Sequence, residues 1–293
     1  MTTKYQQTNK ENTGIDPSGV FPGYNHDDGL NFDENSIDHR LNEVIIPLLM
    51  NTYNKTLSKP LKRILDVGSG AGNLAYFLRN SPLIPPDVEV FTLDGNRETI
   101  NSPFIDKERH FVVRTDEEYG LVDDQGEAVK FDFIISFDHL GHIQPHKLPT
   151  FFENIRDHSH RQTIFLGTTP SWIAHGEEKE DVYPSLATGR EWAVFLAGLQ
   201  TTSIGDYLVL PLPLVIQNIN SLMTPTRGQP WVTEDAATES VIESLPHKGQ
   251  QLLMREIIFS LCQSGDPRFT AWQHRLVSSH LLMTTLLADI EEK

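Results

Sequence analysis

The stretch at residues 64–78 reads ILDVGSGAGNLAYFL and constrains the fold more than any other part of the chain. It starts as a continuous apolar run that is interrupted only by an aspartate, and it ends with apolar residues at helical spacing. Three glycines stand between the two halves at every second position: Gly68, Gly70 and Gly72. This pattern predicts a strand over Arg63–Val67, a glycine-rich turn, and a helix that begins near Asn73.

Strand and helix signals continue to alternate through the centre of the chain. The further strand candidates are residues 88–93, 111–114, 131–137 and 162–166, with a helix over residues 148–159 between the last two. Strands that are separated by helices pair in parallel, and the helices cover the faces of the sheet. We therefore predict an α/β fold with a doubly wound, mostly parallel seven-stranded sheet and helices on both faces.

Segments of different composition flank this centre. Residues 1–35 are rich in Asn, Asp, Gly, Thr and Pro and lack periodicity, which predicts an irregular N-terminal arm. The central domain then covers residues 36–220, and its segment 206–217 alternates in polarity and contains prolines that suit strands at a sheet edge. Apolar residues at helical spacing, among them Met283, predict a C-terminal helical extension over residues 221–293.

The charge of the chain argues against several classes of partner. With 40 acidic and 24 basic residues its formal net charge is −16, which opposes binding to nucleic acid or to an anionic membrane. No run of 18 apolar residues and no signal-peptide pattern is present. The single cysteine, Cys262, allows no internal disulfide, so we expect a cytoplasmic protein without a nucleic-acid or membrane partner.

The glycine turn has the properties of a ligand-binding turn. Glycine permits positive φ angles and close approach of a ligand, and the following helix presents unpaired N–H groups to the same space. Dinucleotide-binding folds space their glycines as GxGxxG, whereas this chain has GxGxG. Asp66 precedes the first glycine by two positions, and its carboxylate favours a ligand that carries a positive group.

The segment LDVGSGAGN resembles the first motif of class I S-adenosylmethionine-dependent methyltransferases, an apolar strand followed by DxGxGxG. The resemblance covers roughly residues 36–216. It implies that S-adenosylmethionine is the cofactor and that Gly68, Gly70 and Gly72 lie against its methionine part and ribose. It also implies that Asp66 helps to hold the ammonium group of the cofactor.

The resemblance extends to the ends of the following strands. Asp94 is placed like the acidic residue that accepts hydrogen bonds from both ribose hydroxyls in this family, and a carboxylate suits that role because it offers two acceptor oxygens. By the same comparison Gly95 and Asn96 flank the adenine. Asp116 stands where the family often has an acidic residue near the adenine amino group.

The sequence FDFIISFDHLGHI resembles the fourth strand of the family and its exit loop, which form the floor of the methyl-transfer site. Ser136 and Phe137 are assigned to the cofactor site on this basis, and His139 and His142 are the candidate catalytic residues. His142 matches the histidine that many members carry here, and a neutral histidine suits proton removal from an acceptor. Two other interpretations stay open: His142 as a structural cap of the next helix, and His139 as a residue at the solvent or pocket rim.

Two further assignments follow from the resemblance. Some relatives bind a divalent metal through an ExxEH pattern, and the corresponding residues here are Asp138, Gly141 and His142. Because the second acid is replaced by glycine, we expect no metal. The loop after the fifth strand is expected to cover the substrate pocket, which Trp172, His175 and Tyr183 would line.

These patterns predict an S-adenosylmethionine-dependent methyltransferase that acts on a small or medium organic acceptor, through an oxygen, nitrogen or carbon atom. Its partners would be the small-molecule substrate and a second copy of the chain, bound through the C-terminal helices. Two alternatives stay open: a non-catalytic binding or assembly protein on a methyltransferase scaffold, and a nicotinamide-dependent oxidoreductase.

Overall fold

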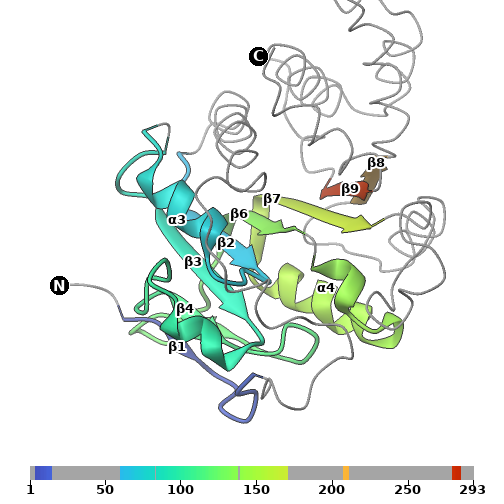
Figure 1. Cartoon of the computed structure of the whole chain (residues 1–293), viewed down its shortest axis with the longest axis horizontal. Coiled ribbons are helices and arrows are strands. Elements are labelled where there is room, and N and C mark those ends of the chain that lie inside the picture. Colours follow the sequence, from blue (N-terminus) through green and yellow to red (C-terminus); the bar gives the residue numbers. More distant parts are fainter. Residues whose placement is uncertain are drawn as a thin grey trace, which may run out of the picture.

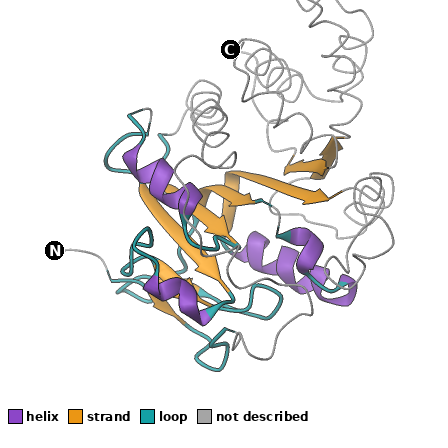
Figure 2. Cartoon of the chain, viewed as in Figure 1, coloured by secondary structure: helices purple, strands orange, loops and turns teal. Residues whose placement is uncertain are grey.

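The computed structural model describes residues 4–14, 60–82, 84–137, 139–170, 207–210 and 279–284. Its strands form one main sheet with helical segments outside it (Figures 1 and 2). The strands of this sheet are β2 (Arg63–Val67), β3 (Glu89–Asp94), β4 (His110–Val112), β6 (Phe131–Ser136), β7 (Ser159–Pro170), β8 (Tyr207–Leu210) and β9 (Ser279–Thr284). The helical segments are α3 (Asn73–Asn80), η2 (Arg97–Asn101), η3 (Leu140–His142), η4 (Pro145–Lys147) and α4 (Leu148–Asp157).

The strand order is β4-β3-β2-β6-β7-β9-β8, and the pairings among β4, β3, β2, β6 and β7 are parallel. The chain moves outward from β2 in one direction through β3 and β4, and then returns to the other side of β2 at β6. α3 lies against β3, and α4 lies beside β7 (Figure 1). The predicted α/β fold with a mostly parallel sheet is confirmed, and β2 stands where the strand order reverses.

Apolar residues on both faces hold the central strands in place. All six residues of β6 are buried, as are four of the five residues of β2, which is typical of parallel strands that are covered on both sides. Phe91 of β3 and Phe131 of β6 meet edge to face, with ring centroids 5.2 Å apart, and Phe152 of α4 packs in the same way on Phe165 of β7. Each buried phenylalanine contributes about 1.5–3 kcal/mol to folding.

The C-terminal segment corrects one prediction. Periodicity placed Met283 on a helix, but Ser279–Thr284 is β9, which pairs antiparallel with both β7 and β8. The apolar run at residues 281–283 is too short to distinguish a strand from a buried helix, and hydrogen bonding to two free strand edges decides in favour of the strand. The rest of the predicted C-terminal helices lies outside the described residues.

Several segments differ in length from their predictions; β6 and α4, for example, end one and two residues early, at Ser136 and Asp157. β7 extends over Ser159–Pro170, beyond the predicted residues 162–166. β4 spans His110–Val112 and ends before the predicted limit at residue 114, because the backbone of Arg114 bonds to the side chain of Asn12. β8 lies at the edge of the sheet, as the prolines of that segment predicted.

The N-terminal arm is described over residues 4–14, where it contains the two-residue strand β1 (Gln6–Gln7). β1 pairs antiparallel with β5 (Leu121–Val122) and so crosses the loop that follows β4 (Figure 1). The other described residues of this stretch form no strand or helix. No helix among the described residues is long and apolar enough to cross a membrane.

A buried carboxylate fastens the sheet at the amino ends of its strands. Asp132 of β6 is 3% exposed and accepts hydrogen bonds from the backbone N–H groups of Lys62 and Arg63, at 2.7 and 2.9 Å. Its other oxygen lies 2.9 Å from Nε2 of His160 in β7. One side chain therefore connects β2, β6 and β7.

We predict that Asp132→Ala lowers the free energy of unfolding by about 3 kcal/mol, because two partly buried N–H groups lose a charged acceptor. Denaturant unfolding followed by circular dichroism measures this change. The control is Asp124→Ala, because Asp124 is exposed, and it should leave the midpoint unchanged. Equal midpoints for the two variants would refute the role of Asp132.

Candidate active site

The glycine turn joins the end of β2 to the start of α3. Gly68, Gly70 and Gly72 all have positive φ angles, of 78°, 51° and 83°. A Cβ atom at Gly72 would lie 2.5 Å from Cδ1 of Ile105, so this position also has no room for a side chain. Backbone conformation therefore favours glycine at all three positions, and close packing adds to this at Gly68 and Gly72.

Asp94, at the end of β3, holds this turn in place. It accepts a hydrogen bond from the Gly70 N–H on Oδ2 and one from the Asn96 N–H on Oδ1, both at 2.8 Å. The N–H groups of Gly68 and Ser69 add bonds to the Leu93 carbonyl. The turn after β2 and the loop after β3 are thus joined through one buried carboxylate.

Asp66 lies beside this carboxylate in an unusual electrostatic environment. Burial, and then the nearby Asp94 carboxylate, raise the pKa of Asp66 from 3.8 to about 7, while Arg79 acts in the opposite direction. The folded protein holds this proton more tightly than the unfolded chain does. Ionisation of Asp66 therefore removes stability as the pH rises from about 4 to about 7.

Several buried polar atoms at the turn have no hydrogen-bond partner within the described chain. They are Oδ2 of Asp66, Oγ of Ser69, Oδ1 of Asn73 and Oγ of Ser136. Ser136 belongs to β6, the strand that pairs with β2 beside Asp66. Buried polar groups are normally paired, so their concentration here fits a polar ligand that would supply the missing contacts.

His139 begins the segment after β6 and lies against the turn. Its Nε2 is 2.7 Å from Oγ1 of Thr115, and a Cβ atom on Gly68 would come within 2.5 Å of its Nδ1. Burial, and then the charge of His142, lower the pKa of His139 from 6.5 to about 4, and Asp116 opposes this shift. His139 is therefore neutral at pH 7, with Nε2 engaged by a threonine.

His142 lies at the end of η3 and is half-buried. Its backbone N–H donates to the His139 carbonyl at 3.0 Å, so the two histidines belong to one turn of chain. Gly141, between them, is buried. The structure thus brings both candidate catalytic residues to the same edge of the sheet as Asp66 and Asp94.

Asn96 and Asp116 have partners within the protein. The side chain of Asn96 caps η2 by accepting a hydrogen bond from the Glu98 N–H at 2.9 Å. The carboxylate of Asp116 pairs with the Arg114 guanidinium through contacts of 3.1 and 2.9 Å. Gly95 connects Asp94 to Asn96, and Phe137 follows Ser136 with a partly exposed side chain.

Other predicted residues lie outside the described part of the chain. These are Asp138, which belongs to the metal alternative, and the substrate-pocket residues Trp172, His175 and Tyr183. Among the residues that are described, no group of three or more histidine, cysteine or acidic side chains could hold a metal ion.

Sequence reasoning missed four polar residues of this region. Ser69 and Asn73 stand inside the motif itself, but their unpartnered atoms become visible only after folding. Thr115 lies in the loop after β4, and Arg79 lies in the last turn of α3, beyond the motif residues. Their roles depend on distances to His139 and Asp66, which no linear spacing encodes.

Comparison with known proteins gives one family match. Residues 37–196, more than half of the chain, match a family described as "Methyltransferase domain". No curated protein matches significantly.

Among solved structures, the plantazolicin methyltransferase BpumL in complex with SAH is 14% identical, with a TM-score of 0.52, over 88% of this chain and 86% of that one. BpumL in complex with a triazolic desmethylPZN analog and SAH has 13% identity and a TM-score of 0.54, over 88% and 87% of the two chains. The methyltransferase BamL in complex with the same kinds of ligand has 12% identity and a TM-score of 0.50, over 88% and 93%. At these identities the likeness concerns the fold.

We predict that Gly68→Ala lowers the free energy of unfolding by more than Gly126→Ala does. Both glycines have φ near +80°, which costs an alanine about 1–2 kcal/mol, but the space around Gly126 is empty, whereas Gly68 faces His139. Chemical denaturation of the two variants measures the difference. In a His139→Ala background the two closest contacts are removed, and the cost of Gly68→Ala should fall; an unchanged cost would show that the ring does not define the turn.

Proposed function

The chain belongs to the methyltransferase-domain family, and from this premise we propose that it transfers a methyl group from S-adenosylmethionine to a small or medium organic acceptor. The cofactor is that of the class I family whose first motif the glycine turn resembles. The observation that carries the proposal is the set of buried, unpartnered oxygens at the turn, together with the Asp94 carboxylate that orders it.

The residues at the turn suit the polar parts of this cofactor. Asp66 would accept hydrogen bonds from the ammonium group, and its ionised form would be favoured by that positive charge. Asp94 uses one lone pair of each oxygen for a backbone N–H, so two acceptor sites stay available for the ribose hydroxyls. The positive φ angles of the three glycines give the turn the conformation that the cofactor would meet.

Gly95, Asn96 and Asp116 would surround the adenine, from the loops after β3 and β4. Because Asp116 is paired with Arg114, the carboxylate that would receive the adenine amino group is already fixed in position. Ser136 and Phe137, at the end of β6, would form the floor beside the methyl group. These assignments follow from the family motif and from the shared edge of the sheet.

When bound, S-adenosylmethionine supplies a methyl group on a positively charged sulfur, and transfer requires an aligned acceptor that has lost its proton if it is a hydroxyl or amine. We assign proton removal to His142. His139 is less suited to this role, because its Nε2 is engaged by Thr115 and its pKa of about 4 makes it a weak base. His139 would instead keep the glycine turn and the loop after β4 at a fixed separation.

The distant structural similarities suggest the size of the acceptor but not its chemical class. The solved structures of BpumL that resemble this fold hold triazolic and pentazolic desmethylPZN analogs beside SAH. This supports an acceptor of similar or smaller size, bound beyond the histidines, where Trp172, His175 and Tyr183 would line the pocket. The alternative of a binding or assembly protein predicts cofactor binding without methyl transfer.

We predict that Asp94→Ala abolishes binding of S-adenosylmethionine and that His142→Ala leaves binding intact but slows turnover at least tenfold, the contribution of a positioned base being about 10²–10⁴-fold. Calorimetry measures the affinity, and transfer of labelled methyl to an acceptor library measures turnover. His146→Ala is the matched control, because His146 is an exposed histidine in the next short helix. Unchanged cofactor affinity in Asp94→Ala would refute the assignment of the ribose contact.

We also predict that the affinity for S-adenosylmethionine rises about tenfold between pH 6 and pH 8, because Asp66 with a pKa of about 7 must lose its proton to accept the ammonium group. Calorimetry on wild type and Asp66→Asn at several pH values tests this. Asp66→Asn has no carboxylate to titrate at this position, so the ratio of wild-type to variant affinity should rise with pH. A ratio that does not change with pH would show that Asp66 does not titrate with binding.

A further inference from the structure

The N-terminal arm follows a defined path across the sheet. Near its start, the Tyr5 hydroxyl donates to the Glu89 carboxylate at 2.8 Å, at the amino end of β3. The arm then pairs with β5 through β1, and the Thr8 N–H donates to the Gly120 carbonyl at 2.8 Å. At Asn12 the arm reaches the loop after β4, which lies at the carboxyl ends of the strands, as the glycine turn does.

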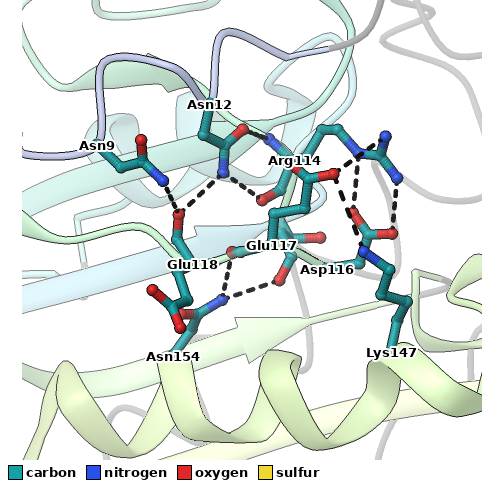
Figure 3. A network of polar contacts seen from close by, with 9 residues as sticks. Asn9, Asn12, Arg114, Asp116, Glu117, Glu118, Lys147 and Asn154 are labelled. Atoms are coloured by element: carbon teal, nitrogen blue, oxygen red, sulfur yellow. Dashed lines mark hydrogen bonds and ion pairs between the residues drawn. The ribbon is translucent and has the colours of Figure 1, made fainter.

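Asn12 is 2% exposed and substitutes for a missing strand neighbour. Its Oδ1 accepts from the Arg114 N–H at 2.7 Å, and its Nδ2 donates to the Arg114 carbonyl at 2.9 Å (Figure 3). Nδ2 also lies 3.3 Å from the Glu118 carbonyl, to which Asn9 donates at 2.9 Å. β4 is an edge strand, and the arm supplies the pairing that its exit loop would otherwise lack.

A second asparagine holds the same loop from the opposite side. Asn154 of α4 is 4% exposed and donates to the carbonyls of Thr115 and Glu117, at 3.1 and 2.8 Å (Figure 3). The loop of residues 114–118 is thus fixed between the arm and α4. Thr115 in this loop also contacts His139, which packs on Gly68.

The end of the described arm reaches the loop after β3. Arg97 donates through Nε to the Thr13 carbonyl at 2.9 Å and through a terminal nitrogen to the Thr13 hydroxyl at 2.6 Å. Gly14 has a φ of 78°, and a Cβ atom there would lie 2.6 Å from the Gly95 carbonyl oxygen. The arm backbone therefore lies directly against Gly95.

We propose that residues 9–14 of the arm form the outer wall of the adenosine half of the cofactor site, with Asn12 as the positioning residue for the loop of residues 114–118. The inference rests on the proposed function, because it identifies the loops after β3 and β4 as the adenosine contacts. It adds that the arm sets the distance between them. Coupling is reciprocal, so bound adenosine should also hold the arm in place.

The test compares the full-length chain with Asn12→Ala. We expect the affinities for S-adenosylhomocysteine and for adenosine alone, measured by calorimetry, to fall by the same factor of about tenfold, since Asn12 supports the half that both ligands share. Asp66→Asn should give the opposite pattern, with weaker binding of S-adenosylhomocysteine and unchanged binding of adenosine. Asp132→Ala weakens the sheet at the amino ends of its strands, away from the cofactor site. This variant should be less stable than the wild type but should bind both ligands with unchanged affinity.

Gly14→Ala tests the wall independently of Asn12, and it serves if Asn12→Ala does not fold. Gly126→Ala is its matched control, because both positions have φ near +80° but no atom lies within 4 Å of a Cβ at Gly126. We expect Gly14→Ala to weaken adenosine binding and Gly126→Ala to leave it unchanged. Hydrogen exchange should show that adenosine slows amide exchange in residues 8–14 of the wild-type chain.

The outcomes separate the two proposals. If the wild-type chain binds neither S-adenosylhomocysteine nor adenosine, the proposed function fails. If the wild-type chain binds both and the Asn12 and Gly14 variants bind them equally well, the cofactor site stands and the role of the arm is refuted. Loss of S-adenosylhomocysteine binding with retained adenosine binding would also contradict the arm proposal, because it would place the arm at the methionine half.

Discussion

The Asp94 carboxylate is the interaction on which the site depends, because its two oxygens join the glycine turn after β2 to the loop after β3. Gly70 and Asn96 each donate a backbone N–H to it, and burial raises its pKa while these two hydrogen bonds lower it. The glycines can adopt their left-handed conformations without strain, but freedom alone would leave the turn mobile. The carboxylate at the neighbouring strand end selects one conformation of the turn.

A series of side-chain contacts stabilises the loops at the carboxyl ends of the strands. His139 separates the glycine turn from Thr115, Asn154 and Asn12 fix the loop that carries Thr115, and the arm closes the side that β4 leaves open. Most of these contacts are made by a side chain that bonds to backbone groups of an irregular loop. Loops that lack a ladder of strand pairing are ordered here by buried amides and carboxylates, which is how an irregular edge acquires a defined shape.

The sequence predicted those features that local chemistry decides. The strand, turn and helix around Gly68 follow from glycine conformation and apolar periodicity, whereas Asp66 and Asp94 were assigned to the site by the resemblance to the family motif. Features that depend on contacts distant in sequence were not predictable: β9 forms because two strand edges are available, and Asn12 is buried because Arg114 has no strand partner. A polar residue in an irregular arm carries no pattern that distinguishes it from a solvated one.

The distribution of unsatisfied polar groups argues that the turn is built for a ligand. Elsewhere in the described chain, most buried polar side chains are paired: His158 bonds to the Asn154 carbonyl and the Leu121 N–H, and His110 lies between Thr92 and Thr99. Besides the four oxygens at the turn, the unpaired buried atoms are a nitrogen of Arg79, a nitrogen of Arg109 and the Tyr119 hydroxyl. Each unpaired buried group costs about 1–3 kcal/mol. The chain pairs the side chains of Asn12 and Asn154 but leaves four oxygens unpaired around one turn. It therefore accepts lower stability at the turn, and contacts from a bound cofactor would recover it.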